Sequence, residues 1–236
     1  MKNFISLILT LLFSFFSAAT QICDDKSGNF VSPVCTDAKY ILIAGSALSF
    51  SLYMTRNIFE RELQDRVVQK NHLNNTGEFG GDIGFGYLNA SYALGAFTFG
   101  GAEGKKSAEQ MIEASAYTFS WTMALKKSVN EPRPGRRDDP DSFPSGHSSF
   151  SFAFASVVTA NHGWYWGGVA YGMATFISFS RMDQDWHYLH DVVAGATIGL
   201  SYGWGVYFNQ EQRKRPYWLS LIPTENGPMA IYAMKW

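Results

Sequence analysis

The sequence predicts an all-α protein, a single helical bundle of about six core helices preceded by a signal peptide. Apolar blocks of helical length recur along most of the chain. No convincing alternation of apolar and polar residues with a period of two interrupts them, as half-buried strands would require. The chain also shows no internal repeat and no low-complexity linker, so a single folded domain is expected.

The first residues have the layout of a secretory signal peptide. Lys2 precedes an uncharged apolar run over residues 4–16, and small residues follow at 17–19. This order predicts a signal peptide over residues 1–19, with cleavage after Ala19. An uncleaved membrane anchor is the alternative, but the run is shorter than the ~20 apolar residues that a span needs.

The polar segment 20–39 contains both cysteines of the chain, Cys23 and Cys35. In the oxidising compartment that a signal peptide implies, two nearby cysteines can close a local loop. We therefore expect a disulfide between them, and two free thiols are the alternative.

The helical domain is expected over residues 40–208, followed by a C-terminal tail at 209–236. Its charged segment 56–70 carries apolar residues on one helical face and polar residues on the other, which indicates a surface helix. The expected core helices span residues 40–55, 83–102, 108–125, 148–160, 164–180 and 192–208.

Charge and hydropathy bound the partners and the location of the chain. A formal net charge of -1 gives no electrostatic reason to expect nucleic acid, so a small-molecule or lipid partner is more natural. Residues 142–180 lack Asp, Glu, Lys and Arg, which would suit two membrane spans. The blocks are nevertheless rich in Gly and Ser, and Glu113 lies inside one, as in a buried bundle. We favour an exported periplasmic bundle, soluble or peripheral; an integral inner-membrane protein is the alternative, and the oligomeric state stays open.

The first candidate site follows the expected helix 108–125. Lys126 and Arg133 stand at the two ends of a stretch stiffened by Pro132 and Pro134. Lysine supplies a compact charge and arginine a planar fork, a combination suited to the oxygens of one phosphate group. A basic helix end favoured by the helix dipole is the alternative interpretation.

The second candidate site is the turn Ser145-Gly146-His147, which leads directly into an apolar helix. Gly146 allows a close approach of the backbone to a ligand, and N–H groups at a helix start bind anions. The hydroxyl of Ser145 and the imidazole of His147 add further donors. A serine-capped helix with an incidental histidine is the alternative.

The third candidate site contains Arg181, His187 and Asp191. His187 and Asp191 share one face if the stretch is helical, because they lie at positions i and i+4. An aspartate there can accept a hydrogen bond from one ring nitrogen and leave the other nitrogen as a nucleophile. An ordinary surface pair is the alternative.

Together, the three patches resemble the signature of the type 2 phosphatidic acid phosphatase and vanadium haloperoxidase superfamily. Every fixed position of Lys-x6-Arg-Pro, Pro-Ser-Gly-His and Ser-Arg-x5-His-x3-Asp is matched between Lys126 and Asp191. The resemblance implies an all-α core and a phosphatase that needs no metal and no cofactor. It makes His187 the nucleophile, His147 the acid and Asp191 the carboxylate that orients the nucleophile. The implied phosphate-binding residues are Lys126, Arg133, Ser145, Gly146 and Arg181.

The implied reaction is hydrolysis of a phosphate monoester or diphosphate through a phosphohistidine. The aromatic, uncharged helices favour a lipid or isoprenoid phosphate as substrate. A secreted non-specific acid phosphatase acting on soluble phosphomonoesters is the alternative, and a vanadium-dependent haloperoxidase is less favoured. Because His187 must be neutral to attack and His147 protonated to donate, we expect a bell-shaped pH profile, with the acid limb set by His187 and the alkaline limb by His147.

Other residues with chemical potential lie outside the signature. His190, His72 and His162 are not spaced as metal ligands, so no metal site is expected. The glycine-rich stretch 77–86 is interpreted as a flexible loop or as a close contact between helices.

Overall fold

The computed structural model describes residues 23, 28–74, 76–214, 217–224 and 227–234. The expected signal peptide, residues 1–19, lies outside this part of the chain. Cys23 and Cys35 form a disulfide, with their Cα atoms 5.3 Å apart. It closes the short loop that the sequence indicated, directly before the helical domain.

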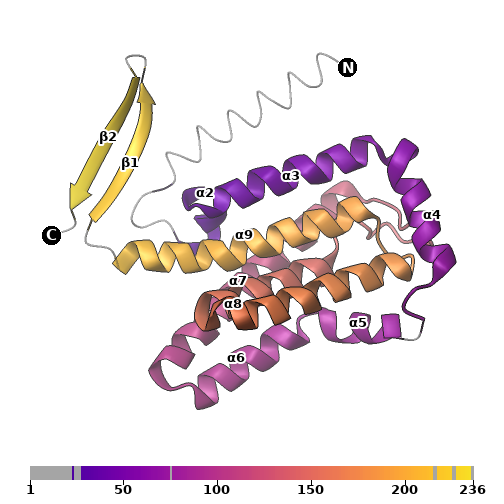
Figure 1. Ribbon diagram of the computed structural model, residues 1–236, viewed down its shortest axis with the longest axis horizontal. Coiled ribbons are helices and arrows are strands. Elements are labelled where there is room, and N and C mark those ends of the chain that lie inside the picture. Colours follow the sequence, from indigo (N-terminus) through magenta and orange to yellow (C-terminus); the bar gives the residue numbers. More distant parts are fainter. Residues whose placement is uncertain (1–22, 24–27, 75, 215–216, 225–226, 235–236) are drawn as a thin grey trace.

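Helices make up the body of the protein, which confirms the all-α class (Figure 1). The elements are η1 (Asn29–Val31), α2 (Ser32–Cys35), α3 (Ala38–Met54), the π-helical turn η2 (Arg56–Glu60), α4 (Arg61–Lys70), α5 (Thr76–Gly84), α6 (Tyr87–Phe99), α7 (Gly101–Val129), α8 (Gly146–Asp183), α9 (Leu189–Lys214), β1 (Tyr217–Thr224) and β2 (Gly227–Met234).

The C-terminal segment differs from the tail expected over residues 209–236. Helix α9 continues past Phe208 to Lys214, and an antiparallel hairpin of β1 and β2 follows. Its register pairs Tyr217 with Met234 and Thr224 with Gly227. The strands lie beyond the end of the bundle, which is why they do not alter its all-α character (Figure 1).

Two of the expected helical blocks are shaped by glycines with positive φ. The expected helix 83–102 corresponds mainly to α6, because its first residues belong to the end of α5 and its last to the start of α7. Gly86, between α5 and α6, has φ +87°. The turn expected between the blocks 148–160 and 164–180 occurs at Gly163, whose φ of 79° interrupts α8. Glycine adopts this left-handed region without the steric cost that a Cβ would add.

Helix α9 occupies the middle of the bundle and contacts α3, α7 and α8 (Figure 1). Its glycines at 195, 199 and 203 share one face, where a Cβ would collide with the carbonyl of Ser145, the carbonyl of Ser149 and the side chain of Ser156. The missing side chains let α8 and α9 approach closely. This contact brings the second and third signature patches together.

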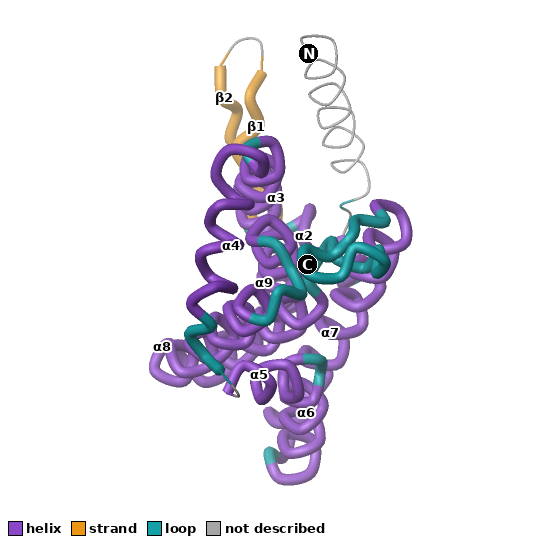
Figure 2. The backbone as a smooth tube through the Cα atoms, turned by 90° about the vertical axis from the view of Figure 1, so that its right-hand side faces the viewer, coloured by secondary structure: helices purple, strands orange, loops and turns teal. Residues whose placement is uncertain are grey.

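Helix α5 packs on α8, α7 contacts both α8 and α9, and α6 packs on α7 (Figures 1 and 2). The main apolar cluster between these helices is built largely from small residues, which suits close helix packing. Its buried members are Ala93, Ala108, Met111, Ala114, Ala155, Val157, Val158, Ala170, Ala174 and Val206. Among the described residues, none of the helices has the combination of length and apolarity that crossing a bilayer requires.

Candidate active site

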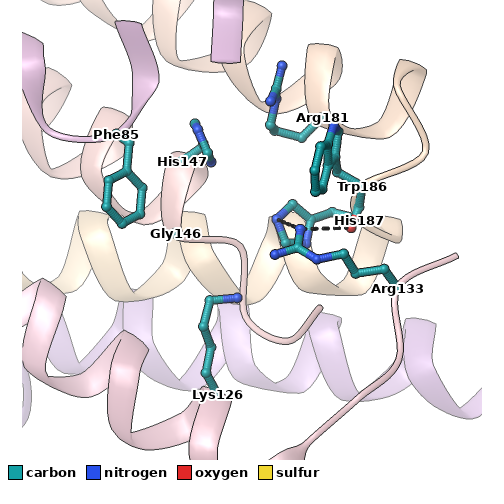
Figure 3. Close-up of a pocket in the computed structure, with 8 residues that line it drawn as sticks. All are labelled: Phe85, Lys126, Arg133, Gly146, His147, Arg181, Trp186 and His187. Carbon is teal, nitrogen blue, oxygen red and sulfur yellow. Dashed lines mark hydrogen bonds between the residues drawn. The ribbon is translucent and has the colours of Figure 1, made fainter. Parts of the chain in front are cut away.

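The three signature patches, far apart in the sequence, line one pocket (Figure 3). Its volume is about 130 Å³. Ligand clefts commonly have roughly 300–1,000 Å³, so this pocket suits a single phosphoryl group rather than a whole large ligand. The lining residues are Phe85, Lys126, Arg133, Gly146, His147, Arg181, Trp186 and His187.

Lys126 and Arg133 contribute two of the cations in the pocket. Lys126 lies in the last turn of α7 and is buried, and its ammonium donates to the carbonyl of Asp141. Burial and the neighbouring Arg133 lower the pKa of Lys126 to about 8, although Asp141 and other carboxylates oppose the shift. Arg133 is held by an ion pair between its Nε and Asp139 Oδ2 at 2.7 Å. Both side chains therefore have fixed positions at the pocket wall.

Arg181 supplies the third cation from the last turn of α8. It is buried, and its Nη2 donates to the carbonyl oxygen of Gly77 at 2.9 Å. Burial and the charge of Arg133 lower the pKa of Arg181 to about 10, while Asp82 opposes the shift. The guanidinium therefore remains charged at neutral pH. Figure 3 shows Arg181 and Lys126 on opposite sides of the pocket.

The second patch forms the start of α8. Ser145 is the N-cap, and its Oγ accepts from the backbone N–H of Ser148 at 3.4 Å. The backbone N–H of Ser145 donates to the carbonyl of Asp191 at 3.0 Å, which ties this turn to the third patch. Gly146 then places the first turn of the helix at the pocket wall, where its N–H groups and the helix dipole favour an anion.

His187 lies between the cations and is buried. Its Nε2 is 3.5 Å from Nη1 of Arg133, and its Nδ1 is 3.6 Å from Oδ2 of Asp191. A separation of 3.6 Å is longer than a hydrogen bond. Oδ2 of Asp191 instead accepts from Oγ of Ser142 at 2.6 Å and from the backbone N–H of Tyr188 at 2.8 Å. The expected pair is assembled, but with a long contact.

His147 lies across the pocket from His187, beside Phe85 (Figure 3). Its Nε2 is 3.0 Å from the carbonyl oxygen of Gly81 and donates to it. Nδ1 is then the ring nitrogen left for a substrate. Burial and the charges of Arg181 and His187 lower the pKa of His147 to about 3. In the ligand-free pocket this histidine is therefore neutral at neutral pH.

Helix α5 is a part of the site that the sequence analysis missed. Its carbonyls at Gly77 and Gly81 accept hydrogen bonds from Arg181 and His147. A Cβ at position 81 would collide with the guanidinium of Arg181, and one at position 84 with Ile177. The close-contact interpretation of the glycines is the one the structure shows. Their spacing at 77, 81 and 84 on one helical face is the signal that could have revealed it.

Two aromatic residues complete the pocket. Phe85 follows α5 and lies against His147, with the ring centroids 5.4 Å apart. Trp186 carries two guanidinium groups near its ring, that of Arg133 at 4.8 Å from the ring centroid and that of Arg136 at 3.6 Å. The aromatic walls keep part of the pocket apolar around its cations.

Potential metal ligands gather at one place in the described part of the chain, behind the pocket. Atoms of Glu131, His190 and Asp191 lie within 4.8 Å of one another there. Each ring nitrogen of His190 already hydrogen-bonds a carboxylate, Glu60 at 2.7 Å and Glu131 at 3.0 Å. Both ring nitrogens of His190 are therefore occupied by hydrogen bonds, whereas Oδ1 of Asp191 is buried without one. His72 and His162 do not line the pocket.

Cations and two histidines surround a small pocket in this all-α bundle. Such a site is typical of proteins that bind a phosphate group or a similar oxyanion. Residues 110–215 match the PAP2 superfamily. The matched stretch contains all three signature patches, and the superfamily is the one that they resemble.

One curated relative is the lipid A 1-phosphatase of Porphyromonas gingivalis, which is 29% identical over 124 residues. The match covers 51% of this chain and 25% of the relative, so the chain spans about a quarter of that protein. Aquifex aeolicus LpxE has a similar fold, with a TM-score of 0.55 and 24% identity over 61% of this chain and 92% of that one. A transmembrane PAP2 type phosphatidylglycerolphosphate phosphatase from Bacillus subtilis gives a TM-score of 0.47 and 21% identity, covering 87% and 97% of the two chains.

Proposed function

We propose that the chain is a phosphatase of the cell envelope, which hydrolyses a phosphate monoester or diphosphate of a lipid or isoprenoid through a phosphohistidine. The observation that carries the proposal is the position of His187. Its Nε2 faces a pocket in which Lys126, Arg133 and Arg181 gather, and the pocket is large enough for one phosphoryl group.

In the first proposed step, Nε2 of His187 attacks phosphorus, a P–N bond forms and the bond from phosphorus to the leaving oxygen breaks. The phosphate dianion in the pocket offsets the positive charges that lower the pKa of His147, so Nδ1 of His147 takes up a proton when the substrate binds. His147 then gives this proton to the leaving oxygen as the alcohol or phosphate departs. In the second step, water attacks the phosphohistidine and His147 takes its proton. The P–N bond breaks, and inorganic phosphate and neutral His187 are restored.

The charges in the pocket can stabilise both steps, so the proposed mechanism does not require a metal ion. Three cationic side chains and the N–H groups at the start of α8 surround the phosphoryl oxygens, where negative charge is spread in the transition state. Burial lowers the pKa of His187, with Lys126 and Arg133 acting in the same direction and Asp191 opposing them. A neutral imidazole is the form that can act as a nucleophile.

A phosphorylated lipid is the substrate class that we favour. Phe85 and Trp186 offer apolar surface beside the cations, which suits an acyl or isoprenoid chain next to its phosphate. The name of the Porphyromonas gingivalis relative, a lipid A 1-phosphatase, points to the same class. Such a substrate is consistent with an exported protein of the cell envelope, either periplasmic or associated with the inner membrane.

The test is phosphate release by the purified chain from an amphiphilic phosphate in mixed micelles and from p-nitrophenyl phosphate in solution. We expect higher kcat/KM for the amphiphile, undiminished activity in a chelator, and inhibition by vanadate. Equal or higher efficiency on the soluble ester would identify a non-specific acid phosphatase instead. Halide oxidation supported by vanadate and peroxide, without phosphate release, would overturn the phosphatase proposal.

A further inference from the structure

Behind the pocket, His190 is enclosed by carboxylates from three parts of the chain. Glu60 comes from η2, Glu131 from the loop after α7, and Asp191 from α9 itself. His190, Glu60 and Asp191 are fully buried, and Glu131 is nearly so. His190 has no place in the three-part signature, and nothing in the proposed reaction uses it directly.

Both ring nitrogens of His190 face carboxylate oxygens. Nδ1 is 2.7 Å from Oε2 of Glu60, and Nε2 is 3.0 Å from Oε2 of Glu131. An ionised carboxylate only accepts hydrogen bonds, so each of these nitrogens must carry a proton. An imidazole with protons on both nitrogens is positively charged. Burial alone would lower the pKa of His190, but the hydrogen bonds to Glu131 and Glu60 outweigh it and raise the pKa to about 10.

Asp191 depends on this charge. Its Oδ2 accepts from Ser142 and from the backbone of Tyr188. Its Oδ1 is buried without a hydrogen bond, and Nε2 of His190 lies 3.1 Å from it. Burial raises the pKa of Asp191, yet His187 and His190 hold it below its usual value. A neutral residue at position 190 would leave Oδ1 buried with no opposite charge so close to it.

The surroundings of His190 fix its orientation. The rings of Tyr188 and Phe143 stack on it at centroid distances of 5.6 and 5.9 Å, and Tyr53 of α3 meets it edge-on at 5.3 Å. Arg56 of η2 adds a second positive charge, 3.1 Å from Oε1 of Glu131. The imidazole therefore has little freedom to turn away from its carboxylates.

We propose that His190 is a positioning residue, an imidazolium that stays charged at neutral pH, keeps Asp191 ionised and holds it in place beside His187. Through Asp191 it secures the tautomer of His187 in which Nδ1 carries the proton and Nε2 is free to attack. This effect on catalysis rests on the proposed function, whereas the charge of His190 does not. The carboxylates of Glu60 and Glu131 also tie η2 and the loop of the first signature patch to the back of the site.

The charge is measured directly by ¹⁵N NMR of the full chain labelled at histidine, with His190→Gln used for assignment. At pH 8 we expect both ring nitrogens of His190 to be protonated, whereas His147 and His187, whose pKa values are lowered, are neutral. A His190 that loses a proton near its ordinary pKa overturns the proposal, and so does a metal ion bound at Nε2, which elemental analysis of the purified protein would also detect. This measurement needs no enzymatic activity, so its result tests the charge of His190 whether or not the proposed function is correct.

The positioning role is tested by kinetics of His190→Gln, with the exposed His162→Gln as the matched control. We expect kcat to fall at least about tenfold and KM to stay nearly unchanged. The reason is that the variant disturbs Asp191, and an orienting carboxylate has large effects on a catalytic histidine. The acid limb of kcat should also move to higher pH, since loss of a positive charge raises the pKa of Asp191 and of His187. A folded variant with parental kcat and acid limb would contradict the role. The double variant Glu131→Gln/His190→Gln removes one charge of each sign, which leaves the net charge of the buried group unchanged. It is measured in the same way, and we expect the same changes in kcat and in the acid limb.

Discussion

Nδ1 of His187 lies 3.6 Å from Oδ2 of Asp191, so the pair is in place but its hydrogen bond is not formed. The same oxygen of Asp191 is held by Oγ of Ser142 and by the backbone N–H of Tyr188. His187 is therefore the partner that must shift. Catalytic hydrogen bonds are often long without substrate and shorten in the complex, and a phosphoryl group drawing Nε2 forward provides the reason for such a shift.

Asp191→Asn tests the role of this pair. Asparagine keeps the shape of the side chain but can present an N–H to Nδ1, which favours the wrong tautomer of His187. We expect kcat to fall by about 10²–10⁴, while KM changes little because Lys126, Arg133 and Arg181 are untouched. Steady-state kinetics on a folded variant measure both values. A decrease confined to KM would show that Asp191 contributes to binding instead.

Gly81→Ala tests the contribution of α5. The added methyl group would collide with the guanidinium of Arg181, and the carbonyl that holds His147 would move with it. We expect KM for the phosphate ester to rise at least about tenfold, as expected when a charged hydrogen bond of 1.5–3 kcal/mol is lost.

The matched control is Gly172→Ala in α8, where a Cβ meets nothing within 4 Å. Alanine there should leave the kinetics unchanged and stabilise the protein by up to about 1 kcal/mol, because it lowers the entropy of the unfolded chain. If Gly81→Ala behaves like this control, Arg181 does not depend on α5.

The alkaline side of the pH profile should follow Lys126. The sequence led us to assign this limb to His147, but the pKa of His147 is about 3 in the empty pocket, so that histidine is already neutral. Lys126 has a pKa of about 8 and binds phosphate only while protonated. We expect kcat/KM to decrease as pH rises through about 8, and the decrease to move to higher pH in Lys126→Arg. An unchanged profile in that variant would contradict the assignment.

Stability should depend on pH through His190 and His147, in opposite directions. The pKa of His190 is raised to about 10, so its contribution is complete below the ordinary histidine pKa and is lost as pH rises through about 10. The pKa of His147 is lowered to about 3, so the neutral form that the fold prefers becomes costly as pH falls below the ordinary value. Thermal unfolding should therefore show a maximum near neutral pH, and His190→Gln should lose the alkaline decrease.

The sequence predicted the parts of the site that lie within short motifs. Lys126, Arg133, His147, Arg181 and His187 all line the pocket. Local rules sufficed because each motif has its own turn or helix end, and the order of the motifs is that of the superfamily which residues 110–215 match. The same rules predicted most helices and the disulfide.

What the sequence did not reveal depends on contacts between distant segments. Gly81 and His147 meet only because α5 lies against α8, and Glu60 reaches His190 from η2. No local pattern contains such pairs. His190 was set aside because a histidine next to a motif has no distinctive spacing, and its significance lies in two carboxylates that are far away along the chain.

The most direct test of the account is to look for the phosphate on His187. The full chain is mixed with substrate, quenched rapidly in alkali, digested, and analysed by mass spectrometry for a phosphopeptide. We expect the phosphate on His187, and we expect acid to remove it. A folded His187→Ala protein should carry no phosphate and should no longer turn over substrate. Near-parental turnover by His187→Ala, or a phosphate carried by a different residue, would contradict the central claim.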